Sequence, residues 1–266
     1  ATPIPRTLAL ILYGDLDISI IDELPKGRQR IDTFCIDSSK KERALGFIKN
    51  LVNQGQQAYI VCPLVEENES NLISSEKYAK DLQTNFFKDY KVGLLHGKMH
   101  SKEKDSVMKD FLENKINILV STTVVEVGID VKNASVIMIE NSDRFGLSQL
   151  HQLRGRVGRG TYKSYCILVS DNKSSVSVSR LQTLCTTNDG LKIADEDLKI
   201  RGPGEFFGKK QHGTPILKIS NLISDIDILQ LAKTCALEIL DEDPFLLNDK
   251  NRVLKASISQ FFHEIQ

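Results

Sequence analysis

The chain has 266 residues, of which 41% are hydrophobic and 26% charged, typical of a globular protein with room for a large domain and an appendage. Its 35 basic and 35 acidic side chains cancel, so net charge gives no reason to expect a polyanion partner, and any phosphate site must be a local patch. No apolar run is long enough to span a membrane, and no signal peptide is visible. The five widely spaced cysteines favour reduced thiols, so we expect a cytoplasmic protein without a membrane partner.

Residues 1–30 are punctuated by prolines and glycines and show no sustained periodicity, which predicts a connector with little core of its own. The sequence begins with Ala1 rather than methionine. We therefore expect the chain to be a piece of a longer protein.

Short apolar runs alternate with helical patterns from residue 31 to residue 171. We expect strands at 31–36, 58–63, 90–95, 116–121, 135–140 and 164–170, with helices at 40–53, 74–87, 101–112 and 148–153. Strands without alternating polarity, separated by helices, indicate a parallel sheet covered on both faces. The fold class predicted for residues 31–171 is therefore α/β.

The character of the sequence changes in residues 172–266. A serine-rich stretch is followed by helical patterns at 179–186 and 191–200, which predict a helical hairpin. A run at 201–213 contains four glycines and several basic residues, and further helices are expected at 225–240 and 253–265. We expect this region to be a helical appendage to the sheet.

Residues 149–160 place Arg154, Arg156 and Arg159 around several glycines, directly after the helical pattern at 148–153. Arginine presents a planar fork of donors that suits phosphate oxygens, and glycine lets the backbone turn sharply. We call residues 155–160 the arginine turn. By themselves these residues fit either an anion site or a basic surface turn.

Polar residues follow three of the expected strands. His96 and Gly97 follow one, Thr122 and Thr123 follow another, and the arginine turn comes one helix after a third. Because ligands bind at the carboxyl ends of strands in open parallel sheets, we expect all three groups to converge on one edge. The plainer interpretation of residues 120–130 is a strand, a loop and a capping aspartate. A metal site at His96 and His100 is not expected, since no third ligand follows at a suitable spacing.

Together these stretches resemble a known family. Residues 120–130 and the Gln152-x-x-Gly155-Arg156-x-Gly158-Arg159 pattern are similar to motifs V and VI of the superfamily 2 helicases, and Ala1-Thr2 looks like the end of motif III. Residues 143–159 resemble the version found in the RecG family and in transcription-repair coupling factors. Residues 201–211 resemble the translocation motif of both. The patterns in residues 2–28 and 187–198 favour the RecG family.

This resemblance implies a RecA-like second lobe of a motor that has two such lobes, followed by the hairpin of the translocation motif. The implied cofactors are ATP and Mg²⁺, held mainly by a first lobe whose Walker lysine and acidic box this sequence lacks. The implied partners are branched double-stranded DNA, the first RecA-like lobe and a wedge domain of the same protein. We expect a monomer.

The resemblance also assigns roles to individual residues. Arg159 becomes an arginine finger for the γ-phosphate, Arg156 a second phosphate contact, and Gln152 a positioning residue. Gly128 and Asp130 line the nucleotide side, while the DNA backbone is met by His96, Gly97, Thr122 and Thr123. The residues implied in translocation coupling are Arg201, Gly204, Glu205 and Gln211.

Two other functions remain open at this point. One alternative is the motor of a transcription-repair coupling factor, which pushes RNA polymerase. Taken alone it is also a non-enzymatic DNA-binding fragment, because without a Walker lysine we expect it not to hydrolyse ATP.

Overall fold

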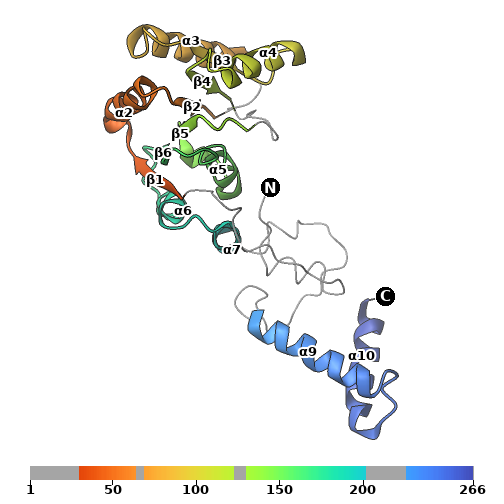
Figure 1. The fold of residues 1–266 in the computed structure, drawn as a ribbon. Coiled ribbons are helices and arrows are strands. Elements are labelled where there is room, and N and C mark those ends of the chain that lie inside the picture. The colour runs from red at the N-terminus through yellow and green to blue at the C-terminus, as the bar shows by residue number, and fades with distance from the viewer. Residues whose placement is uncertain (1–29, 64–68, 123–129, 202–225, 266) are drawn as a thin grey trace. The chain divides into compact units, whose positions relative to one another are not determined.

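The computed structural model describes residues 30–63, 69–122, 130–201 and 226–265 (Figure 1). The chain divides into two compact units, Ala1–Gly202 and Pro203–Gln266, and each is described by itself. Nearly all of the expected connector at 1–30 lies outside the described residues. So do five of the expected site residues, which are Thr123, Gly128, Gly204, Glu205 and Gln211.

The first unit is built on a six-stranded parallel sheet. Its strands are β1 (Ile31–Ile36), β2 (Gln57–Val61), β3 (Val92–Leu95), β4 (Ile118–Ser121), β5 (Ala134–Ile139) and β6 (Ser164–Val169). Their order is β1-β6-β5-β2-β4-β3, and each neighbouring pair is parallel. The parallel α/β fold expected from the sequence is confirmed.

Helices cover both faces of this sheet (Figure 1). They are α2 (Lys41–Asn53), α3 (Glu69–Asn85), α4 (Ser101–Leu112), α5 (Leu147–Arg154), α6 (Ser175–Thr186) and α7 (Gly190–Arg201), with 3₁₀ turns η1 (Ser38–Lys40) and η2 (Ser142–Arg144). One core lies between the sheet and α4–α7, and the other between the sheet and α2 and α3. Along β2, Tyr59 and Val61 enter the first core while Ala58 and Ile60 enter the second. This alternation explains why the central strands are apolar throughout.

Two helices begin earlier than the sequence predicts. Helix α3 begins at Glu69 rather than residue 74, and α6 begins at Ser175 rather than residue 179. The serine-rich stretch supplies the start of α6, because Ser174 is the N-cap of the helix and its hydroxyl accepts the Ser177 N–H at 3.3 Å. Serine at this position satisfies a backbone donor that would otherwise lack a partner.

The α6–α7 hairpin packs as part of the sheet domain. Leu181 and Leu184 of α6 and Ile193 of α7 belong to the same core as the inner face of α5. Packing therefore divides the chain at Gly202 and Pro203, well beyond the change in composition after residue 171.

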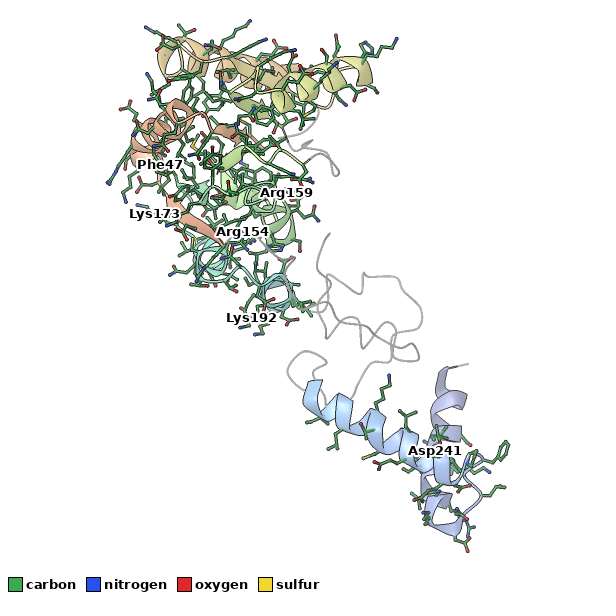
Figure 2. All side chains as sticks on the ribbon, in the orientation of Figure 1. Phe47, Arg154, Arg159, Lys173, Lys192 and Asp241 are labelled. Atoms are coloured by element: carbon green, nitrogen blue, oxygen red, sulfur yellow. The ribbon has the colours of Figure 1, made fainter. Side chains whose placement is uncertain are left out.

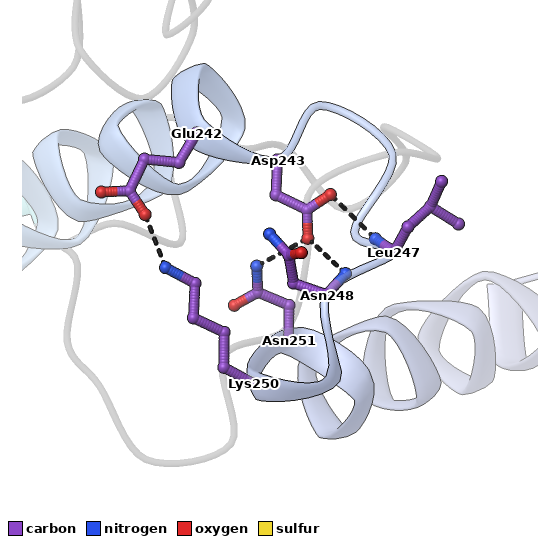
Figure 3. Close-up of polar contacts among 6 residues, drawn as sticks. All are labelled: Glu242, Asp243, Leu247, Asn248, Lys250 and Asn251. Carbon is purple, nitrogen blue, oxygen red and sulfur yellow. Dashed lines mark hydrogen bonds and ion pairs between the residues drawn. The ribbon is translucent and has the colours of Figure 1, made fainter.

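The second unit contains α9 (Ile226–Glu242), η3 (Asp249–Asn251) and α10 (Arg252–Ile265). The Asp243 carboxylate holds the turn between the helices by accepting the N–H groups of Leu247 and Asn248 at 2.8 and 2.9 Å (Figure 3). It also accepts the Asn251 Nδ2 at 2.9 Å, and Lys250 pairs with Glu242 at 2.6 Å. None of the helices within the described ranges is long and apolar enough to cross a membrane.

Candidate functional site

The arginine turn is held at the end of helix α5. The helix begins after Gly146, whose N–H donates to Gln149 Oε1 at 3.1 Å, and ends at the C-cap Gly155. Gly158 has a φ of +78°, in the left-handed region that side chains with a Cβ rarely adopt. Arg156 and Arg159 therefore lie on either side of this glycine, within four residues of the C-cap Gly155.

Arg154 does not belong to the anion site. Its side chain is 2% exposed, and its Nη1 donates to the carbonyl oxygens of Leu184 at 2.7 Å and Thr187 at 2.9 Å. These carbonyls lie at the end of α6, where cations are favoured by the helix dipole. The idea that all three arginines point at an anion is therefore wrong for Arg154, because its guanidinium donates to carbonyl oxygens inside the protein. Arg154 and Arg159 are both labelled in Figure 2.

A glycine seats the arginine turn against the segment that precedes β5. A Cβ built on Gly160 would lie 2.1 Å from the Lys132 carbonyl oxygen, far inside van der Waals contact. The two backbones can approach in this way only while residue 160 has no side chain. This contact holds the turn against the segment before β5 at the residue that directly follows Arg159.

Arg159 is held by the turn but remains accessible. Its Nε donates to the Gly155 carbonyl oxygen at 3.0 Å, and its Nη1 lies 3.4 Å from Asp130 Oδ1. The Arg159 side chain is 28% exposed and that of Asp130 is 51% exposed. Asp130 therefore orients the guanidinium at the surface without burying it.

Arg156 is buried and, among the described residues, incompletely paired. It is 8% exposed, and its Nε has no hydrogen-bond partner in the described part of the chain. Burial lowers the pKa of Arg156, and the neighbouring positive charge of Arg159 lowers it further. Both effects disfavour the cation, so an anion placed here would relieve them. The arrangement fits a phosphate group.

Tyr59 is a further residue near the arginine turn, and no role is expected for it from the sequence. It lies in β2, is 1% exposed, and packs edge-on against Phe111 with ring centroids 5.0 Å apart. Burial raises the pKa of its phenol, while the positive charges of Arg156 and Arg159 oppose that rise. Its phenol thus faces the charges of the arginine turn. The sequence does indicate which face of the sheet Tyr59 lies on, because side chains alternate along β2 and Tyr59 falls on the face that α5 covers.

Two other expected residues lie on helices. Gln152 lies half-buried on α5, one turn before the arginine turn. Arg201 is the last residue of α7.

His96 and Thr122 lie at neighbouring strand ends. The Thr122 N–H donates to the Leu95 carbonyl oxygen at 3.1 Å, which joins the carboxyl ends of β3 and β4. Thr122 is 4% exposed, and neither its Oγ1 nor the buried Nδ1 of His96 has a partner within the described residues. Gly97, next to His96, is exposed.

The arginine turn does not converge with these strand ends, so that expectation is wrong. His96 and Thr122 follow β3 and β4, whereas Gly160 contacts Lys132, which precedes β5. In a parallel sheet these are opposite edges. The reason is that α5 follows the carboxyl end of β5 and runs back along the face of the sheet. The arginine turn at its end therefore lies at the amino ends of the strands.

No group of three or more histidine, cysteine, aspartate or glutamate side chains in the described ranges is arranged to hold a metal ion. The carboxylate that pairs with the arginine turn is that of Asp130.

Comparisons with known proteins identify relatives of this chain. Residues 39–161 match the model of the helicase conserved C-terminal domain, and residues 187–263 match that of ATP-dependent DNA helicase RecG, domain 3, C-terminal. The chain is 46% identical over 256 residues to the ATP-dependent DNA helicase RecG of Bacillus subtilis (strain 168), covering 96% of this chain and 38% of that protein. It is 49% identical over 247 residues to that of Synechocystis sp. (strain ATCC 27184 / PCC 6803 / Kazusa), covering 92% of this chain and 30% of that protein.

A solved structure of RecG bound to a three-way DNA junction is similar in fold. It has a TM-score of 0.68 and 45% sequence identity, with 86% of this chain and 30% of that chain covered. The chain therefore spans less than two-fifths of the length of these relatives. The sequence likeness over most of the chain, the two family models and the shared fold place this chain in the RecG family of bacterial ATP-dependent DNA helicases, of which it represents the C-terminal part.

Proposed function

We propose that this chain is the second motor lobe and translocation hairpin of an ATP-dependent double-stranded DNA translocase that remodels branched DNA, such as stalled forks and four-way junctions. The proposal concerns the whole protein, since the chain spans 38% of its Bacillus subtilis relative. It is supported by family membership and by the chemistry of the arginine turn.

The carrying observation is the pair formed by Arg156 and Arg159. Arg159 is oriented by Asp130 at 3.4 Å yet remains accessible, and the buried Nε of Arg156 lacks a partner in the described chain. Planar guanidinium groups suit the oxygens of a phosphoryl group. In this proposal Arg159 contacts the γ-phosphate, Arg156 makes a second phosphate contact, and Gln152 positions the reacting groups.

The ATP and Mg²⁺ of this proposal would supply the phosphoryl chemistry and would be held mainly by the first lobe. Asp130 keeps Arg159 in place at the facing surface, and Gly128, outside the described residues, is assigned to the same side. An arginine that stabilises the charge of phosphoryl transfer is worth roughly 10³–10⁵ in rate in other NTPases. The finger is therefore the residue on which hydrolysis depends most within this chain.

DNA is assigned to the opposite edge of the sheet. His96, Gly97, Thr122 and Thr123 follow strand ends, where hydroxyls and backbone N–H groups position phosphates without reading sequence. This separation gives the nucleotide and the DNA different surfaces of one lobe, so that a movement caused by ATP can be passed to DNA through the sheet and its helices.

Coupling between the arginine turn and the hairpin has a physical route. Arg154, at the end of α5, donates to the Leu184 carbonyl oxygen near the end of α6. Ser148 Oγ of α5 lies 3.2 Å from Asp197 Oδ2 of α7. Arg180 Nη1 of α6 donates to the carbonyl oxygen of Phe145, just before α5, at 3.3 Å. Helix α5 is thereby clamped to both hairpin helices. Helix α7 leads to Arg201 and to the segment that carries Gly204, Glu205 and Gln211, which we assign to translocation coupling.

We further propose a monomer located in the cytoplasm, together with a first RecA-like lobe and a wedge domain of the same protein. The named relatives are bacterial DNA helicases, and bacterial chromosomes lie in the cytoplasm. The membership in the RecG family leaves no observation that favours the transcription-repair alternative.

The function is tested with the full-length protein on matched substrates. We expect it to unwind a synthetic fork and a four-way junction in the presence of ATP and Mg²⁺, and to leave a linear duplex of the same length intact. A non-hydrolysable ATP analogue should give binding without unwinding. ATP-dependent unwinding that shows no preference for branched DNA would contradict the substrate class, and hydrolysis by residues 1–266 alone would contradict the two-lobe arrangement.

A further inference from the structure

Two cysteines lie on elements of the sheet domain that pack against each other. Cys35 belongs to β1, the strand at one end of the sheet, and Cys185 belongs to the last turn of α6. Both are free thiols, and Cys35 is exposed while Cys185 is half-buried. Neither of them has a role in the proposed function.

The register of the sheet places Cys35 on the face that α6 covers. Thr33 pairs with Cys166 of β6, and Cys35 pairs with Leu168. Both of these β6 residues belong to the core between the sheet and α4–α7. Because side chains two residues apart on a strand share a face, Thr33 and Cys35 point to the same side of the sheet. Helix α6 packs against β1 on that side.

Arg154 shows how closely the end of α6 approaches β1. Its Nη1 lies 3.4 Å from Thr33 Oγ1 and 2.7 Å from the Leu184 carbonyl oxygen. Thr33 is two residues from Cys35 on one face of β1. Leu184 directly precedes Cys185 in α6. A single guanidinium therefore bridges the chain neighbours of the two thiols.

The electrostatics of the two thiols agree with this placement. The pKa of the Cys185 thiol is raised to about 11, chiefly by burial and also by the Cys35 thiol, while Arg154 and the Cys35 N–H oppose the rise. Burial and the carboxylate of Asp37 raise the pKa of Cys35. Both thiols are therefore protonated at neutral pH, and any reaction of theirs should become faster as pH rises, because the thiolate is the nucleophile.

We propose that Cys35 and Cys185 form a redox modification site, at which a low-molecular-weight disulfide such as oxidised glutathione converts the pair into an intramolecular disulfide. Cys35 is the residue that reacts first, because its thiol is exposed. Cys166, the other thiol on this face of the sheet, is 1% exposed and is shielded from such a reagent.

The reaction is two successive thiol–disulfide exchanges. The Cys35 thiolate attacks one sulfur of the small disulfide, whose S–S bond breaks, and the departing thiolate takes up the proton that Cys35 lost. The Cys185 thiolate then attacks the Cys35 sulfur and releases the second small thiol in the same way. Two electrons and two protons pass from the cysteine pair to the small disulfide, which leaves as two thiols.

The new bond joins β1 to the last turn of α6, so the α6–α7 hairpin can no longer shift against the sheet. Its consequence for activity rests on the proposed function, in which this hairpin passes movement of the arginine turn to DNA. Oxidation should therefore slow fork unwinding more than ATP hydrolysis. A thiol reductant such as dithiothreitol should reverse the effect.

The test is peptide mapping of the full-length protein by mass spectrometry without reduction, after incubation with oxidised glutathione. We expect a peptide pair linked through Cys35 and Cys185, formed faster at mildly alkaline than at neutral pH. Cys185→Ser should instead retain glutathione on Cys35, because the resolving thiol is missing. Cys185→Ala, which adds no hydroxyl to this half-buried position, should behave in the same way. Cys235→Ser, at an exposed cysteine of α9, is the control and should form the parental link.

The outcomes separate the thiol pair from the proposed function. If the parent kept as much glutathione on Cys35 as Cys185→Ser does, or linked Cys35 to a different cysteine, the pair would be overturned. A linked protein that unwinds forks at the rate of the reduced parent would overturn the effect on the hairpin. Cys35→Ser should unwind forks equally well with and without oxidant. If the reduced parent unwound no forks, the proposed function would fail, whereas the linked peptides would still establish the modification site.

Discussion

The backbone of Gly160 lies against that of Lys132 so closely that a single added carbon at residue 160 would come within 2.1 Å of the Lys132 carbonyl oxygen. Gly160→Ala must therefore shift the arginine turn or the segment before β5. We expect a loss of about 1–3 kcal/mol in the free energy of unfolding, as for overpacking of other interiors. Chemical denaturation of the full chain measures it.

Gly46→Ala is the matched control for this change. Gly46 lies within α2, and a Cβ built there would meet nothing within 4 Å. Alanine in a helix interior is favoured over glycine by about 0.5–1 kcal/mol, so this variant should be neutral or more stable than the parent. Equal losses in the two variants would mean that the contact with Lys132 is not what holds the turn.

Arg154 is expected to matter for stability rather than for phosphate binding. Arg154→Ala removes hydrogen bonds from a charged donor, each of which contributes about 1.5–3 kcal/mol, and leaves the Leu184 and Thr187 carbonyls without that donor. We expect unfolding at a clearly lower denaturant concentration. Arg159→Ala, at a partly exposed position, should change the denaturation midpoint little; if the two variants lost equal stability, the structural role of Arg154 would be wrong.

Acid should loosen the turn between α9 and α10. Hydrogen bonds from Asn248, Asn251 and Leu247 hold the pKa of Asp243 below its usual range. A lowered folded-state pKa means that the stabilisation is complete above the ordinary aspartate value of about 4 and disappears as pH falls through the lowered value. The amide chemical shifts of Leu247 and Asn248 should follow this loss, and Asp243→Asn should abolish the pH dependence. If the amide chemical shifts of Leu247 and Asn248 in the parent protein stayed constant until all aspartates were protonated, the stabilising role of the Asp243 carboxylate would be contradicted.

The sheet was predictable because its signal is local. Each of β4, β5 and β6 contains an apolar run, and a parallel sheet covered on both faces requires such runs. The expected helix at 101–112 has the same bounds as α4, because the spacing of its apolar residues is also a local signal. By contrast, the first turn of α6 was missed because a serine-rich stretch fits a loop as well as a cap, and only the Ser174–Ser177 hydrogen bond distinguishes them.

The candidate site was only partly predictable. Residue types identify Arg154, Arg156 and Arg159 equally, and nothing in their spacing reveals that Arg154 is used inside the protein while Arg159 is accessible. Tyr59 was missed for a related reason, since its proximity to the arginines depends on the return of α5 across the sheet. Tertiary contacts of this kind have no signature in a single sequence.

Coupling through the hairpin predicts a separation of activities. Arg201→Ala at the end of α7 should leave most DNA-stimulated ATP hydrolysis in the full-length protein but reduce fork unwinding strongly. The reason is that the contacts between α5 and the α6–α7 hairpin stay intact, while the end of α7, which leads to the translocation motif, is altered. Lys199→Ala, an exposed neighbour paired with Glu196, is the control and should leave both activities near the parental level. Parallel loss of hydrolysis and unwinding in Arg201→Ala would refute the coupling role.

The most direct test of the motor assignment is the DNA-stimulated kcat for ATP hydrolysis of full-length Arg159→Ala, measured beside Arg43→Ala, an exposed arginine on α2. We expect the Arg159 variant to lose roughly 10³-fold or more in kcat, as other NTPases do without their arginine finger, while its affinity for a fork stays within a few-fold of the parent. Arg43→Ala should retain both. Near-parental hydrolysis by Arg159→Ala would contradict the assignment of the arginine turn to the nucleotide.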